Sequence, residues 1–179
     1  MWAIPNNTQM PSLIIRKGLI EKVNFMRYIC DTCKSIYHDP VPCWKCHTIP
    51  RELDSTEYNA IVNQFARKWL PVFRGINTPG WFDRDTGLKE EFAHAIFALG
   101  VGIDDSTFQC FFDNLTIRDV WDSTEIFLRK IDQIRDAELL VLMIFCKWRY
   151  RVSRREYTND IKTWCVAALE QLILVTNNK

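Results

Sequence analysis

Histidine is scarce in this chain, with three among 179 residues. The sequence also lacks the short motifs of common catalytic sites: the Gly-x-Ser-x-Gly elbow, the phosphate-binding loop, the His-Glu-x-x-His helix and the dinucleotide fingerprint. His94 is flanked by alanines in an expected helix, where a surface or structural role is simpler than that of a base. These absences favour a binding protein over an enzyme, and we assign no residue to catalysis.

Long apolar runs are missing as well. The longest, Leu139–Cys146, is far short of the roughly 20 residues that cross a bilayer. The N-terminus has neither the basic nor the apolar part of a secretory signal, so we expect a cytoplasmic protein without a membrane partner. Thiols stay reduced in the cytoplasm, which favours metal binding over disulfides for clustered cysteines.

The net charge of +1 predicts no general attraction to nucleic acid or to acidic membranes. The charge is nevertheless uneven, because basic and acidic side chains number ten and six in residues 1–80, six and thirteen in 81–140, and seven and three in 141–179. Apolar residues make up 47% of the chain, enough to bury a core. We therefore expect a globular protein with a polarised surface.

Four of the seven cysteines form two Cys-x-x-Cys pairs that are nine residues apart, Cys30 with Cys33 and Cys43 with Cys46. Each pair can hold one side of an ion, and four thiolates complete the tetrahedral shell of structural Zn²⁺ sites. Such a shell leaves no position open for water. The four cysteines are therefore predicted to bind a structural zinc ion.

The cysteine pattern leaves other metal chemistry open. An iron–sulfur cluster also uses four thiolates. Residues 43–47 formally match a c-type haem attachment motif, although a haem would leave Cys30 and Cys33 unexplained. His38 or His47 can replace a cysteine as a ligand. The other cysteines are expected in the core, where a thiol behaves as a small hydrophobe: Cys110, Cys146 and Cys165.

Residues 25–50 resemble a zinc ribbon, with a strand expected over 23–29 before the first cysteine pair and a proline-containing turn before the second. Lys34 and His47 depart from the pattern, because zinc ribbons commonly have glycine there. The resemblance implies, by analogy of fold, a partner that is nucleic acid or a nucleic-acid-bound protein. A looser resemblance links the C-terminal part to a family of small bacterial helical proteins of unknown function. It is carried by Leu140, Leu142, Arg149, Tyr150, Arg151, Leu169 and Leu172.

From residue 53 the apolar pattern becomes helical. Asp54 and its neighbours offer capping oxygens before an apolar face that ends near Pro71. Later apolar faces predict helices near residues 88–99, 105–112, 120–134, 139–152 and 159–175. The stretch from Leu139 is apolar almost all round, so we expect it at the centre. The predicted fold is mainly α, with a small zinc-ribbon-like β element in residues 1–52 and a compact multi-helix bundle in residues 53–179.

Two sets of residues are candidate partner sites. Residues 147–155 carry five positive charges with two aromatic side chains between them, a pattern that suits phosphate as well as a solvated helix end. We predict a nucleic-acid contact by Lys147, Arg149, Arg151, Arg154 and Arg155. The alternative is a protein–protein adaptor or inhibitor, of the kind that a mobile element encodes, with exposed aromatic anchors at Trp44, Trp81 and Phe82.

Overall fold

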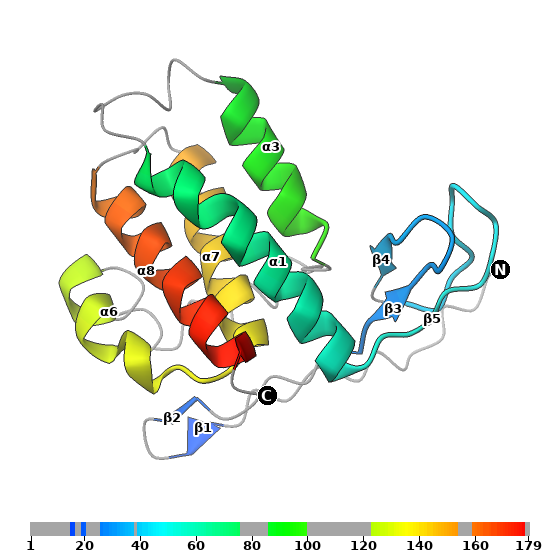
Figure 1. Cartoon of the computed structure of the whole chain (residues 1–179), viewed down its shortest axis with the longest axis horizontal. Coiled ribbons are helices and arrows are strands. Elements are labelled where there is room, and N and C mark those ends of the chain that lie inside the picture. Colours follow the sequence, from blue (N-terminus) through cyan, green and yellow to red (C-terminus); the bar gives the residue numbers. More distant parts are fainter. Residues whose placement is uncertain are drawn as a thin grey trace, which may run out of the picture.

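The structure, a computed structural model, describes residues 15–16, 19–20, 26–37, 39–75, 86–99, 123–153 and 159–177. These residues form five α-helices preceded by small antiparallel sheets, which confirms the predicted mainly-α fold with an N-terminal β element (Figure 1). The helices are α1 (Ser55–Arg74), α3 (Thr86–Phe97), α6 (Thr124–Lys130), α7 (Ala137–Ser153) and α8 (Asn159–Asn177).

The strands are very short. β1 (Ile15–Arg16) pairs with β2 (Leu19–Ile20), and the second sheet has the order β4–β3–β5. Its strands are β3 (Tyr28–Ile29), β4 (Ile36–Tyr37) and β5 (Arg51–Glu52). The strand expected over 23–29 is thus shorter in the part that the structure describes, where only its last two residues pair. A hydrogen-bonded turn that starts at Cys30 replaces the ladder beyond Ile29.

Helix α1 begins where its sequence predicts, but it ends at Arg74, three residues after Pro71. Asp54 Oδ1 accepts a hydrogen bond from the amide of Glu57 at 2.8 Å, which is the expected N-terminal cap. Pro71 lies inside the last turn, and the amide of Gly75 donates to the Pro71 carbonyl at 3.0 Å. The helix therefore continues past Pro71, whose missing amide hydrogen removes one helical hydrogen bond.

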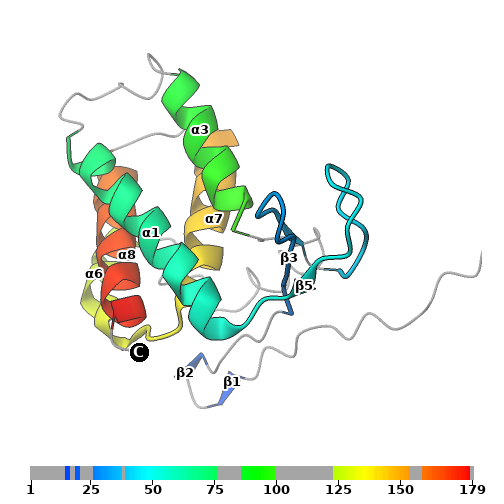
Figure 2. The same cartoon turned by 45° about the vertical axis from the view of Figure 1, so that its right-hand side comes forward.

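The helices bury one aromatic-rich core. Helix α8 packs against α1, α6 and α7, while α7 also contacts α1 and α3 (Figures 1 and 2). All side chains in 139–144 are at most 3% exposed, which confirms the central place expected for this stretch. Phe92 lies among four aromatic rings at centroid distances of 4.6 to 5.7 Å: Phe65, Trp69, Phe73 and Trp148.

Helix α6 is shorter than the segment predicted over 120–134. It begins after Ser123, whose Oγ accepts from the amide of Ile126 at 3.3 Å, and it ends at Lys130. A 3₁₀ turn follows, and the carbonyl of Ile134 accepts a 3.0 Å bond from Nε2 of Gln171 on α8. This partly buried tertiary contact takes the place of a further helical hydrogen bond, which local periodicity cannot predict.

Arg27 connects the three-stranded sheet to the bundle. We call the described residues between 26 and 52 the N-terminal module. Arg27 is 4% exposed, and its Nη1 lies 3.2 Å from Oε1 of Glu138 on α7. Its guanidinium carbon is 4.1 Å from the ring centroid of Tyr58 on α1, and its carbonyl accepts from the amide of Leu53 at 2.8 Å. The module therefore packs on the bundle.

The variant Glu138→Ala leaves the buried Arg27 guanidinium without this carboxylate. We expect it to lower the free energy of unfolding by about 3 kcal/mol, the low end for a buried pair. Lys68→Ala, which breaks the exposed Lys68–Glu91 pair, is the control and is expected to cost less than about 1 kcal/mol. Urea unfolding measures both, and equal losses would contradict a role for the Arg27 contact.

Candidate metal centre

The four predicted cysteines converge inside the N-terminal module. Their Sγ atoms all lie within 4.8 Å of one another, and those of Cys33 and Cys43 are 3.5 Å apart. One pair comes from the β3–β4 connection and the other from the β4–β5 connection. Cys30 and Cys43 are fully buried. The fold therefore forms a four-thiol cluster from two separate turns.

The two turns have the same backbone geometry. In each, an amide four residues after the first cysteine donates to that cysteine's carbonyl, Lys34 to Cys30 and His47 to Cys43, both at 2.7 Å. The amide of the first cysteine in turn donates to the carbonyl five residues later, Cys30 to Ser35 at 3.0 Å and Cys43 to Thr48 at 2.9 Å. These bonds fold each turn around its pair of thiols and orient both sulfurs to the same side.

Lys34 and His47 adopt left-handed backbone conformations, with φ of 61° and 57°. These are the two positions at which the sequence lacks the glycine that zinc ribbons commonly have. A side chain in this region costs about 1 kcal/mol relative to glycine, because Cβ approaches the following carbonyl. Lysine and histidine therefore occupy two positions at which glycine would adopt the same backbone conformation without strain.

Hydroxyl groups surround the sulfurs of the first turn. Thr48 Oγ1 lies 3.3 Å from Cys30 Sγ, and Ser35 Oγ lies 3.2 Å from Cys33 Sγ. The hydrogen bond from Thr48 is the main cause that lowers the pKa of the Cys30 thiol to about 6. A thiol that loses its proton this readily is prepared for a metal, because the thiolate is the ligand.

The second turn has a similar donor. The hydroxyl of Tyr37 donates to Cys43 Sγ at 3.0 Å, which lowers the pKa of Cys43 and raises that of Tyr37 to about 12. Burial, followed by hydrogen bonding to Cys33, raises the pKa of Cys46 to about 12. Four thiolates this close repel one another, so a cation between them is needed to hold all four deprotonated.

The cluster fits a single tetrahedral ion. Metal–sulfur bonds of about 2.3 Å place sulfurs about 3.8 Å apart around such an ion. The Cys33–Cys43 separation of 3.5 Å and the 4.8 Å upper limit for all the sulfur pairs lie on either side of this value. The donor set is all sulfur, and hydroxyl groups orient three of its members. Such surroundings suit a closed site rather than one that exchanges water.

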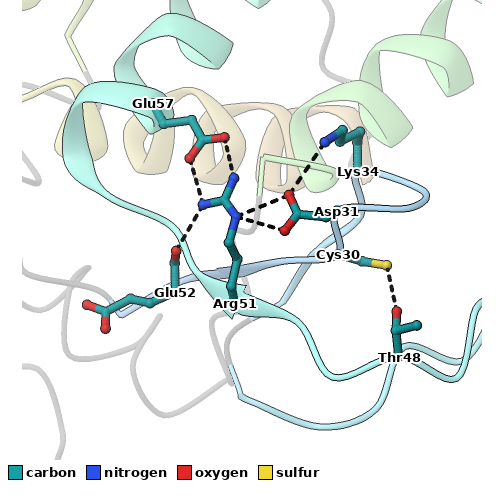
Figure 3. Close-up of polar contacts among 7 residues, drawn as sticks. All are labelled: Cys30, Asp31, Lys34, Thr48, Arg51, Glu52 and Glu57. Atoms are coloured by element: carbon teal, nitrogen blue, oxygen red, sulfur yellow. Dashed lines mark hydrogen bonds and ion pairs between the residues drawn. The ribbon is translucent and has the colours of Figure 1, made fainter.

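Arg51 joins the first turn to helix α1 (Figure 3). Its Nε lies 3.1 and 2.9 Å from the two carboxylate oxygens of Asp31, which stands between Cys30 and Cys33. Its Nη1 and Nη2 donate to the carboxylate of Glu57 at 2.9 and 2.8 Å. These bonds lower the pKa of both carboxyls. The cysteine turn is therefore tied to the first turn of α1.

Lys147 lies in the core, which corrects its expected place on the exposed face of the basic stretch. It is 2% exposed, and its Nζ is 5.3 Å from the ring centroid of Trp164 on α8. Its long apolar stem continues the buried face of α7 against α8. The backbone of Arg149 and Arg151 is helical. Arg154 and Arg155 lie outside the described residues.

Of the three predicted aromatic anchors, Trp44 is 71% exposed in the second cysteine turn, whereas Trp81 and Phe82 lie outside the described residues. His47 and His94 are exposed, and His38 is not described. Two of the cysteines expected in the core, Cys146 and Cys165, are fully buried, while Cys110 is not described.

The hydroxyl partners of the sulfurs and the contacts of Arg51 were not predicted from the sequence. A signal was present, because each cysteine pair is followed by one further residue and then a hydroxyl residue, Ser35 in the first turn and Thr48 in the second. In both turns the hydroxyl residue of this short repeat accepts the backbone hydrogen bond that closes the turn and lies within 3.3 Å of a cysteine sulfur. Tyr37 and Arg51 carry no comparable signal, since their partners depend on the pairing of the strands.

Comparison with protein-family models, with curated proteins and with solved structures found no match. The resemblance of the C-terminal part to a bacterial helical family thus gains no support, and the zinc-ribbon resemblance rests on the cysteine cluster. None of the helices in the described part of the chain combines the length and apolar character needed to cross a membrane.

Lys34→Gly and His47→Gly are each expected to raise the free energy of unfolding of the metal-loaded protein by about 1 kcal/mol, because glycine accepts a left-handed backbone without strain. Thr32→Gly is the control. Thr32 lies in the same turn without a positive φ, so glycine there should only destabilise. Urea unfolding decides, and losses in all three variants would contradict the assigned strain.

Tyr37→Phe removes one hydroxyl donor to Cys43 and keeps the ring. We expect the affinity for metal to fall about tenfold or more, as is usual when a partner of a ligand is lost. Tyr28→Phe, in the neighbouring strand, is the control and should bind metal like the unmodified chain. Competition with a chromophoric chelator gives both affinities, and an unchanged value for Tyr37→Phe would count against the role of its hydroxyl.

Proposed function

We propose that this chain is a zinc-stabilised binding protein, with one Zn²⁺ held by Cys30, Cys33, Cys43 and Cys46 in a structural role. The convergence of four thiols within 4.8 Å is the observation that carries the proposal. Four sulfur ligands fill the coordination shell, so no position is left for a water or substrate. The function is then binding rather than metal-assisted catalysis.

A single ion accounts for the geometry better than an iron–sulfur cluster. Several irons and bridging sulfides would occupy more space than four sulfurs within 4.8 Å enclose. Zinc is favoured among single ions because tetrahedral all-thiolate sites are typical of structural zinc.

The metal has a physical task in this module. The strands have two residues each, and few apolar side chains between 26 and 52 are buried, Ile29 being the one that joins the main core. A structural zinc ion contributes about 10–16 kcal/mol of binding free energy, which replaces the missing core. The Arg27 and Arg51 contacts then hold the ordered module on the bundle.

Nucleic acid is the partner class that we propose, through Arg149, Arg151, Arg154 and Arg155 of the basic stretch. The +4 charge of residues 141–179 and the geometry of arginine toward phosphate support it. Lys147 is left out because it is buried.

Elemental mass spectrometry on protein purified without added metal tests the zinc. We expect one zinc per chain, and we expect Cys30→Ser to lose it while Cys146→Ser, a change at a buried cysteine of α7, keeps it. Chelation should collapse the amide resonances of residues 26–52 in NMR spectra and leave those of α1 and α8 dispersed. A metal-free protein with an ordered module would contradict the proposal.

Changing the four arginines to glutamine together tests the partner. If each arginine contacts one phosphate of a single strand, the slope of log affinity against log salt should become shallower by about 3. Binding with an unchanged slope would contradict a role for these residues.

A further inference from the structure

Exposed apolar side chains are concentrated on the N-terminal module. Among the described residues seven large hydrophobic side chains are exposed, and four of them belong to the module: Met26, Val41, Trp44 and Ile49. The last three lie on the β4–β5 connection at 50%, 71% and 76% exposure. Hydrogen bonds from Cys43 to Thr48 and from His47 to Cys43 close this connection into a compact turn. The connection lies on the side of the module away from the helices (Figures 1 and 2).

Trp44 is exposed to solvent, with the ammonium of Lys45 over one face of its ring. The Nζ of Lys45 lies 5.0 Å from the centroid of its ring. The neighbouring thiols Cys43 and Cys46 point into the four-sulfur cluster, so the metal fixes the backbone on both sides of the indole. A large aromatic ring on a braced turn loses little conformational entropy when a ligand stacks on it.

His47 adds a second ring to the same turn. It is exposed and has a φ of 57°, a conformation in which glycine would be unstrained. Backbone strain of this kind persists at binding sites when the side chain has a use there. An imidazole three residues after Trp44 can stack or donate to a phosphate.

The small size of the second cysteine turn favours a nucleic-acid strand over a protein as its partner. A stable protein–protein interface draws on about 20–30 residues from each side, whereas residues 41–49 are a single short turn. A nucleic-acid strand needs less surface, since one unpaired base can stack on one aromatic ring while a cation meets the adjacent phosphate. The combination of an exposed indole, an adjacent ammonium and an imidazole fits a single strand.

We propose that the second cysteine turn binds single-stranded nucleic acid, with an unpaired base stacked on Trp44 and the ammonium of Lys45 at the neighbouring phosphate. This inference rests on the proposed function and adds a contact that reads unpaired bases. Arg149, Arg151, Arg154 and Arg155 would supply most of the salt-dependent attraction, and the turn would supply the preference for a single strand over a duplex.

Fluorescence anisotropy with the full zinc-loaded chain tests the inference, using a labelled oligothymidylate about twelve nucleotides long and the same strand annealed to its complement. Trp44→Ala should weaken binding of the single strand between about fivefold and 150-fold, the range for one stacked base, and leave the salt slope unchanged. Trp44→Phe should restore most of the affinity. Lys45→Gln should instead reduce the slope by about 0.7.

Phe97→Ala is the matched control, since Phe97 is 63% exposed on α3 and should not affect binding. Zinc content is measured on every variant, so that loss of the metal is separated from loss of the stacking contact. The inference is overturned if Trp44→Ala binds the strand as the unmodified chain does, or if the duplex binds equally well. If the arginine variants alone lose affinity, the proposed function stands without this contact. If the zinc-loaded chain binds neither probe, both nucleic-acid assignments fail and the zinc assignment remains.

Discussion

The convergence of four thiols is the constraint on which the N-terminal module depends. Two turns separated along the chain bring their sulfurs within 4.8 Å, in a segment whose strands are two residues long. Thiolates at such distances repel one another unless a cation lies between them, and short strands with little apolar burial do not hold the turns together unaided. One tetrahedral ion would resolve both difficulties, because it would remove the repulsion and crosslink the two turns.

Two arginines, one buried and one partly exposed, connect the N-terminal module to the bundle. Arg27 is buried between Tyr58 and Glu138, so it fixes the position of the sheet on the helices. Arg51 is 44% exposed and bridges Asp31 in the first cysteine turn to Glu57 in α1. Both contacts join the N-terminal module to the bundle, and Ile29 of the module belongs to the same buried cluster as the helical residues.

Local signals in the sequence predicted the parts of this structure that local chemistry determines. The Asp54 cap, the apolar face of α1 and the cysteine spacing were sufficient for the first helix and the cluster. Prediction failed where a distant element decides. Lys147 was expected on the surface from its charged neighbours but packs near Trp164, and the segment after Lys130 leaves the helical path where Gln171 binds Ile134. The missing glycines at Lys34 and His47 were visible, but their left-handed backbone was not.

X-ray absorption at the zinc edge of the purified protein tests the central claim most directly, because it reports the identity and distance of the ligands without a crystal. The account predicts a single shell of four sulfurs at about 2.3 Å. A shell that contains nitrogen or oxygen at about 2.0–2.1 Å would contradict it, since a histidine or water would then replace one of the four thiolates.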